Sequence, residues 1–430
     1  MWCPPKSPGT QSTLQTAQLQ TALGKNGCQN SHPPSPSIRA RMEATLRGHR
    51  PDRPPFIDRL ELWYKTHIRA GTLPEEFHGL SLTDIHRRVG LGQQKFVAAH
   101  GQRLRGVEMT VRFGDEVLMR ESDPLVEFFP RMSDLAVQDR PGVTTIAMST
   151  PVGRLRMQYE MLPQMVAAGT EAYIREYPIK DESDYRTAEY ILERIEFVSY
   201  RERILQAEQE LGDIGFVVPT VCRIPFQQML LEFVGEINLF YALHDHPQQV
   251  ERLMEVLDGN MCRDLENLAD VPNPYVEFTD NLHGLMTNPR LFTRYCLPQY
   301  QRYADIIHGQ GKVMGSHTDG DMKPLLHLLP ECGLDVAESF SPAPLTALTF
   351  DEAWAAWQHR PMIWGGIPSP ILEERTPEGE FREFVAHILE TIGGRPIILG
   401  IGDQVMGNSL IERVRYIAAQ VEAMPSAPTG

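Results

Sequence analysis

The tripeptide His317-Thr318-Asp319 is the strongest candidate for chemistry in the sequence. In an extended segment, residues two apart project to the same side, so one ion can touch both the imidazole and the carboxylate. Both groups are ordinary zinc ligands, and a third from Asp403 or Glu338 would leave the open position of a catalytic site. The structural alternative is a histidine that ends a strand and an aspartate that caps a helix. We predict a zinc or other divalent transition-metal site at His317, Asp319 and Asp403.

Further polar residues and glycines follow other short apolar segments of the chain. An arginine can meet a substrate carboxylate, and glycines let a ligand approach the backbone closely. The alternative for Arg223 is a surface ion pair, and the alternative for Trp63 is a place in the hydrophobic core. We predict three catalytic carboxylates, Glu277, Asp280 and Glu338, and four substrate-binding residues, Arg223, Trp63, Gly365 and Gly366.

The segments that must position these residues alternate between short apolar strands and amphipathic helices after residue 180. Such alternation predicts an α/β fold with a parallel sheet covered by helices, and the number of strands favours a TIM (β/α)8 barrel. Catalytic groups of such barrels lie at the carboxyl ends of the strands. No GxGxxG follows an early strand, which disfavours a dinucleotide-binding sheet. The predicted strands are 216–221, 275–278, 312–316, 335–338, 361–364 and 396–400, and the predicted helices are 185–210, 247–269, 289–309, 322–331, 349–358, 378–393 and 408–424.

The N-terminal part of the chain has a different pattern. Residues 106–160 alternate between apolar and polar side chains around turn residues, which predicts a small antiparallel β-meander. Residues 1–38 are rich in Pro, Ser, Thr and Gln and nearly lack aromatics, so we expect a disordered tail. One barrel domain over 39–425, including the meander, would follow this N-terminal extension.

Composition excludes several classes of protein. The 430 residues carry 41 Lys and Arg against 56 Asp and Glu, a formal net charge of −15. Such a surface repels phosphate backbones and anionic lipid heads, so we expect neither nucleic acid nor membrane as a partner. No apolar run approaches the roughly 20 residues needed to span a bilayer. Six scattered cysteines without a CxxC pair suit a reducing compartment, so we expect a cytoplasmic protein.

Several segments, in order, resemble the uroporphyrinogen decarboxylase (URO-D) superfamily over roughly residues 40–425. True decarboxylases of that superfamily have an N-terminal arginine motif that binds the tetrapyrrole, and it is absent from residues 57–63 here. The resemblance therefore implies the other branch, zinc-dependent methyltransferases that move a methyl group to or from a corrinoid on a partner protein. The matching segments are PDRPPF at 51–56, TPVG at 150–153, IKDESDY at 179–185, DNL at 280–282, NPRLF at 288–292, GKV at 311–313 and GGI at 365–367.

The sequence departs from that branch at two metal ligands. The resemblance implies a His-x-Cys pair and a later cysteine, whereas Asp319 follows His317 and Asp403 lies near the later position. Oxygen ligands leave a metal a stronger Lewis acid toward oxygen than thiolates do. We therefore expect a small substrate with an O- or N-linked methyl group. No DxHxxG corrinoid motif is present, so the corrinoid would arrive on a partner protein.

Two alternatives stay open. A URO-D-type lyase of the porphyrin pathway would need arginines around the barrel mouth, and Arg59, Arg120 and Arg223 are the candidates. A non-catalytic URO-D-like binding protein could have lost both cysteines. Aspartate at both positions favours a retained metal site.

Overall fold

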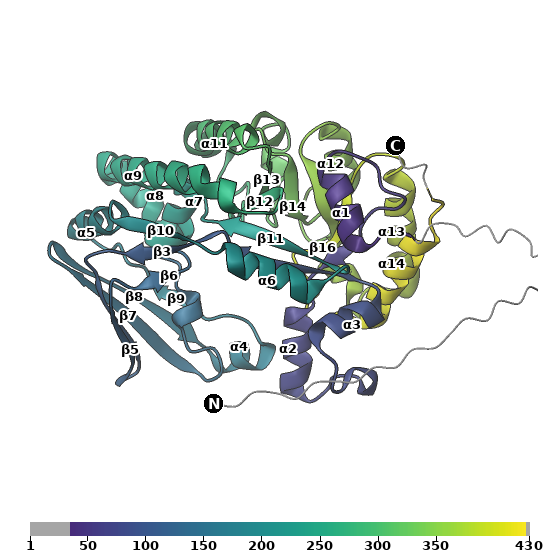
Figure 1. Cartoon of the computed structure of the whole chain (residues 1–430), viewed down its shortest axis with the longest axis horizontal. Helices are drawn as coiled ribbons and strands as arrows, with labels where there is room; N and C mark the ends of the chain where they lie inside the picture. The colour runs from purple at the N-terminus through teal and green to yellow at the C-terminus, as the bar shows by residue number, and fades with distance from the viewer. Residues whose placement is uncertain (1–34, 427–430) are drawn as a thin grey trace, which may run out of the picture. The chain divides into compact units, whose positions relative to one another are not determined.

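A closed parallel barrel forms the centre of the computed structural model, which describes residues 35–426 (Figure 1). Its strands pair in the order β1-β2-β11-β12-β13-β14-β15-β16, and a parallel bridge between Phe56 and Leu399 joins the first strand to the last. The predicted TIM-barrel class is thereby confirmed. The strands are β1 (Ile57–Asp58), β2 (Gly92–Ala98), β11 (Gly215–Val221), β12 (Tyr275–Phe278), β13 (Val313–His317), β14 (Val336–Phe340), β15 (Met362–Pro368) and β16 (Ile398–Gly402).

The barrel is packed with side chains and closed at its amino-terminal end. Phe216, Tyr275 and Trp364 lie in one buried cluster inside it, as large apolar side chains commonly do in such barrels. Helix α1 (Ile38–Leu46) adds Met42 and Leu46 to the same cluster. The carboxyl ends of the strands are therefore the open end, where a site can form.

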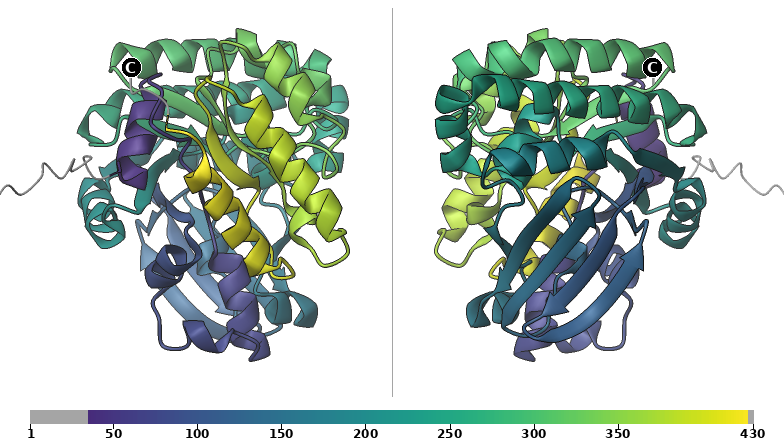
Figure 2. Two further views of the ribbon diagram at one scale, coloured as in Figure 1. Left: turned by 90° about the vertical axis from the view of Figure 1, so that its right-hand side faces the viewer. Right: turned by 90° about the vertical axis from the view of Figure 1, so that its left-hand side faces the viewer.

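Helices cover the outside of the barrel, and α13 and α14 run along it in the left view of Figure 2. The first strand is followed by two helices that we did not predict, α2 and α3. Helix α8 was not predicted either, and the remaining helices are short or match the predicted segments closely, apart from two corrections given below. The helices are α2 (Glu61–Ala70), α3 (Leu82–Val89), α4 (Pro163–Ala168), α5 (Glu182–Leu192), α6 (Arg201–Leu211), α7 (Pro225–Gln228), α8 (Glu236–Asp245), α9 (Pro247–Glu266), α10 (Pro289–Leu291), α11 (Leu297–Gly309), α12 (Phe350–Ala356), α13 (Glu378–Thr391) and α14 (Ile411–Ala423).

Two of the predicted helices are wrong. The segment 185–210 is divided by strand β10 (Ile195–Ser199), which pairs antiparallel with β3 (His100–Leu104). The segment 322–331 holds only two 3-10 turns, Lys323–Leu325 and Leu329–Glu331. Each of those turns contains a proline, and Pro330 cannot donate the backbone hydrogen bond that a continuous helix needs at that point.

An insertion between β2 and β11 builds two antiparallel sheets at the carboxyl end of β2. The larger sheet has the order β5-β4-β7-β8-β9, confirms the predicted meander and appears as a separate blue layer in the right view of Figure 2. The smaller has the order β10-β3-β6. The insertion thus starts where the open end of the barrel lies. Its further strands are β4 (Glu108–Phe113), β5 (Glu116–Ser122), β6 (Leu125–Val126), β7 (Gly142–Thr150), β8 (Gly153–Met161) and β9 (Tyr173–Glu176).

The ends of the chain are described only in part. Most of the predicted tail, residues 1–34, lies outside the described residues. Ser37 caps α1 by accepting a hydrogen bond from the backbone N–H of Ala40 at 3.2 Å. Among the described helices, none is long and apolar enough to cross a membrane.

Candidate active site

Three carboxyl ends of neighbouring strands bring His317, Glu277 and Glu338 together. His317 is the last residue of β13, and the register of the barrel places it opposite Glu338 of β14. On the other side, β12 pairs with β13 so that Glu277 lies opposite Gly315. Residues two apart on a strand share a face, so His317 and Gly315 face the same side and His317 meets both glutamates.

The distances between these three side chains are those of a possible metal site. His317 Nδ1 lies 2.6 Å from Glu338 Oε2 and 3.9 Å from Glu277 Oε1. One ligand atom from each residue falls within 4.8 Å of the others, and all three residues are buried. An imidazole with two carboxylates is a donor set that zinc and related divalent metals accept.

Neighbouring polar groups orient the two glutamates but leave one oxygen free. Gln94 Nε2 donates to Glu338 Oε1 at 2.8 Å, and the Tyr275 hydroxyl donates to Glu277 Oε2 at 2.8 Å. Glu277 Oε1 is buried and has no hydrogen-bond partner among the described residues. A buried carboxylate oxygen without a donor is costly, and a bound cation would satisfy it. The site therefore fits a metal ion.

Burial and charge set the protonation of the group when no metal is bound. Burial, and then the neighbouring charge of Glu338, raise the pKa of Glu277 well above its ordinary value. Burial opposes the charged form of His317, but Glu338, Asp319 and Asp403 outweigh it and raise the pKa of this imidazole well above its ordinary value. Both shifts favour the protonated forms of Glu277 and His317 when no metal is bound.

Asp403 and Asp319, two of the three predicted metal ligands, face the other imidazole nitrogen. His317 Nε2 lies 3.3 Å from Asp403 Oδ1 and 3.9 Å from Asp319 Oδ2. Asp403 is also paired with Arg59, whose Nη2 lies 2.7 Å from Oδ1. Burial would raise the pKa of Asp403, but His317 and Arg59 outweigh it and hold that pKa well below its ordinary value. Asp403 therefore already has two cationic partners.

A cavity of about 670 Å³ opens beside this group. Glu277, His317 and Asp403 line it from the strand ends, while Arg131 and Phe128 come from the insertion. Its size falls within the usual range of small-molecule sites, about 300–1,000 Å³. Five basic and five acidic side chains line it: Arg59, Lys65, Arg69, Arg131 and Arg223 against Glu127, Asp134, Glu171, Glu277 and Asp403. The cavity is thus charged but balanced.

Arg223, which we predicted to bind substrate, lines this cavity, and Asp280, which we predicted to be catalytic, does not. The Arg223 guanidinium donates to Glu232 Oε1 at 2.8 Å and to Asn281 Oδ1 at 2.6 Å. Asp280 is fully buried and accepts hydrogen bonds from Tyr300, Ser316 and the backbone N–H of Ile224. The structure therefore places Asp280 behind the cavity wall, as a group that holds loops together.

The remaining predicted substrate contacts lie away from the cavity. Trp63 is on the buried face of α2, where its indole N–H donates to the carbonyl of Ser409 at 3.2 Å. Gly365 and Gly366 are buried in β15 with φ of +132° and +95°. A Cβ on Gly365 would lie 2.6 Å from the carbonyl oxygen of Phe340, so this glycine lets two strands approach.

Sequence reasoning did not find Gln94, Tyr275 or Arg131. The first two lie in barrel strands. In the sequence alone, a polar strand residue that points into the barrel cannot be told from one that points outward. Arg131 follows strand β6 in the insertion, and no local pattern separates it from other arginines. Arg120, named as a possible mouth arginine, is exposed on β5 and does not line the cavity.

Residues 233–424, which include every strand from β12 to β16, match the family model of uroporphyrinogen decarboxylase (URO-D). Over these residues, a little under half of the chain, the protein is similar to that family. The predicted resemblance is confirmed on this region, and the match contains His317, Glu277 and Glu338. No curated protein sequence matches the chain.

Two solved structures resemble this chain. A methyltransferase from Methanosarcina mazei has a TM-score of 0.54 at 12% identity, with 90% of this chain and 99% of that one covered. At that identity the likeness shows a shared fold. An octameric ribulose-1,5-bisphosphate carboxylase/oxygenase from Pyrococcus horikoshii OT3 has a TM-score of 0.25 at 12% identity, covering 53% and 48% of the two chains.

Proposed function

We propose that the protein is a metal-dependent methyltransferase that moves a methyl group between a small O- or N-methylated substrate and a corrinoid on a partner protein. The observation that carries this proposal is the buried Glu277-His317-Glu338 group beside a cavity of substrate size. The URO-D match and the shared fold with a protein named as a methyltransferase support the same class of enzyme.

The metal ligands of this proposal are Glu277, His317 and Glu338. A metal bound there would act as a Lewis acid that stabilises negative charge on the leaving group of the substrate. Gln94 and Tyr275 hold the two carboxylates in place, and residues of the insertion line part of the cavity. Arg131 and Arg223 line the cavity and both lie close to Glu232.

His317, Asp319 and Asp403 remain the alternative ligand set. The ion pair between Arg59 and Asp403 disfavours it, because a guanidinium 2.7 Å from a ligand oxygen repels a second cation. Metal content of Glu277→Gln and Glu338→Gln, compared with Asp319→Asn and Asp403→Asn, separates the two sets. Loss of metal only in the aspartate variants would refute the set that we favour.

The enzymatic test is direct. Metal-loaded protein is incubated with a reduced corrinoid protein and a panel of methyl ethers and methylamines, while the visible spectrum of the corrinoid is followed. We expect one member of the panel to methylate the corrinoid, and the His317→Ala variant to be inactive. If no member of the panel reacts and a tightly held ligand co-purifies, the non-catalytic binding protein becomes the better description.

A URO-D-type lyase is the second candidate, because arginines do line the cavity. Arg59, Arg131 and Arg223 line the cavity, and a polycarboxylate bound there would contact them. Each is close to a carboxylate, Asp403 for the first and Glu232 for the others, so little free positive charge remains. Release of CO₂ from uroporphyrinogen by the purified protein would favour the lyase over the methyltransferase.

We predict that Tyr275→Phe weakens metal binding without unfolding the protein. The substitution removes the hydroxyl that donates to Glu277 Oε2 and keeps the buried ring. Loss of a group that orients a metal ligand typically costs 10–100-fold in affinity, and we expect about 10-fold here. A competition titration with a chromophoric chelator measures it, with Tyr303→Phe, a buried tyrosine that bonds to Asp258 elsewhere, as the control.

We also predict that metal affinity rises with pH. The metal-free site holds protons because the pKa values of Glu277 and His317 are raised, and a metal must displace those protons to bind. Below the raised pKa values, each proton released makes the apparent affinity rise by up to about tenfold per pH unit. The same chelator competition at several pH values measures the slope. A flat profile across neutral pH would contradict the prediction.

A further inference from the structure

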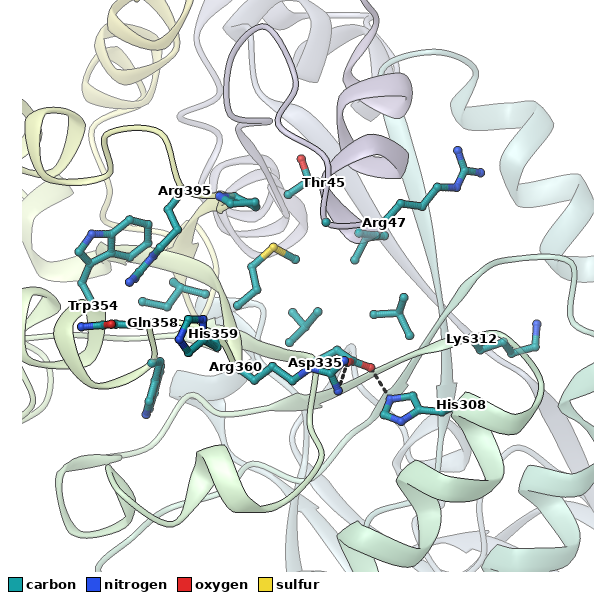
Figure 3. Close-up of a pocket in the computed structure, with 18 of the residues that line it drawn as sticks. Thr45, Arg47, His308, Lys312, Asp335, Trp354, Gln358, His359, Arg360 and Arg395 are labelled. Atoms are coloured by element: carbon teal, nitrogen blue, oxygen red, sulfur yellow. Dashed lines mark hydrogen bonds and ion pairs between the residues drawn. The ribbon is translucent and has the colours of Figure 1, made fainter. Parts of the chain in front are cut away.

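A second pocket lies at the opposite end of the barrel from the candidate active site (Figure 3). We call it the basal pocket, and its volume is about 550 Å³. It is bounded by the first residues of three strands, Val313, Val336 and Met362, and by the end of α1. His317 is the last residue of the strand that Val313 begins, so the two sites are separated by about 13 Å of strand.

The basal pocket is strongly basic in a chain that is acidic overall. Four arginine and lysine side chains line it, whereas Asp335 is the one carboxylate among its lining residues. The active-site cavity, by contrast, has equal numbers of basic and acidic side chains. The basic residues are Arg47, Lys312, Arg360 and Arg395, with His308 and His359 in addition. A basic concave surface raises the local concentration of anions.

The single carboxylate is already neutralised. Asp335 Oδ2 lies 2.7 Å from His308 Nε2 and accepts the backbone N–H of Met314 at 2.8 Å. Asp335 Oδ1 lies 2.9 Å from Arg360 Nη1. Both oxygens of Asp335 are therefore already paired, and this carboxylate does not neutralise the remaining basic groups.

Arg395 is the basic group that the fold leaves without an anionic partner. Its guanidinium lies 3.4 Å from the centre of the Trp354 ring. It makes no ion pair or side-chain hydrogen bond with any residue of the described part of the chain. Figure 3 shows Arg395 on the same side of the basal pocket as His359, which also has no such partner within residues 35–426. A guanidinium held by ring stacking keeps its hydrogen-bond donors free for a ligand.

We propose that the basal pocket binds a small organic phosphate. Arg395 would hold the phosphate group together with His359, since a guanidinium can donate two parallel hydrogen bonds to phosphate oxygens. Arg360, which pairs with Asp335, lines the same pocket and adds positive charge to it. The apolar side chains of Val313, Val336 and Met362 would contact the organic part of the ligand. A phosphate monoester carries nearly two negative charges. Several basic groups should therefore bind it more tightly than a ligand with a single carboxylate.

Calorimetric titration of the full-length protein with glycerol 3-phosphate and inorganic phosphate, at constant ionic strength, tests this proposal. We expect one site, with glycerol 3-phosphate bound more tightly than inorganic phosphate. Arg395→Gln and Arg360→Gln should each weaken binding about tenfold, or about 1.4 kcal/mol. His317→Ala should bind as the wild type does, because His317 lies at the other end of the barrel.

Arg382→Gln is the matched control for Arg395→Gln. Arg382 also stacks on an aromatic ring, that of Tyr416, at 4.4 Å, but it lies outside the basal pocket. Arg360 is half exposed, so its variant should fold even if Arg395→Gln does not. No saturable binding by the wild type, equal binding by both arginine variants and the wild type, or equally tight binding of butyrate would each overturn the proposal.

Discussion

Replacement of His317 by alanine is expected to abolish both metal binding and methyl transfer. His317 is the residue shared by both possible ligand sets, because its two ring nitrogens face Glu338 on one side and Asp403 on the other. Loss of a ligand should cost more than loss of a supporting group, so we expect metal affinity to fall by more than about 100-fold. Elemental analysis should find about one metal ion per wild-type chain and almost none in the variant.

The matched control is His327→Ala, which changes an exposed histidine outside the candidate site. It should keep both the metal and the activity. Thermal unfolding of metal-free wild type and His317→Ala separates loss of a ligand from loss of the fold. A wild-type protein without transition metal after growth and purification in metal-containing medium would contradict the proposed metal site.

Replacement of Asp280 by alanine is expected to lower the free energy of unfolding by about 3–5 kcal/mol, because it leaves buried donors without an acceptor. The Tyr300 hydroxyl and the Ser316 hydroxyl lie 2.5 and 2.7 Å from Asp280 Oδ2, and the backbone N–H of Ile224 lies 2.7 Å from Oδ1. These bonds join the loop after β12 to β13, to α11 and to the segment after β11. Urea denaturation followed by circular dichroism measures the loss.

Asp270→Ala serves as the control, since Asp270 is exposed at the surface and should change stability by no more than about 0.5 kcal/mol. The experiment also decides between two roles for Asp280. The sequence suggested catalysis, and the contacts indicate positioning of the loops. An Asp280→Ala protein that is as stable as the wild type but inactive would restore the catalytic interpretation.

The sequence was a good guide to the barrel because strand periodicity and apolar content are local properties. The strand segments at 216–221, 275–278 and 312–316 agree with the structure to within one residue at either end. The predicted helices were wrong in two places. At Pro324 and Pro330, prolines interrupt an amphipathic pattern. Between 185 and 210, strand β10 has a polar and apolar pattern that we took for part of a helix.

The residues around His317 could be predicted only in part. A histidine and carboxylates at strand ends are visible in the sequence, and Glu277, Glu338 and Asp403 do lie near His317. Which carboxylate meets which nitrogen depends on the register between strands, a long-range property. The pairing of His317 with Glu338 across β13 and β14 is the deciding contact.

By itself, the sequence determined the class of fold, and it predicted a site at the strand ends with His317 at its centre. Only the tertiary structure decided that Glu277 and Glu338 lie on its Nδ1 side, that Asp403 is paired with Arg59, and that an insertion supplies Arg131 to the cavity. The physical reason is that periodicity is set by neighbours along the chain. Contacts between strands and insertions, in contrast, are set by packing of the whole barrel.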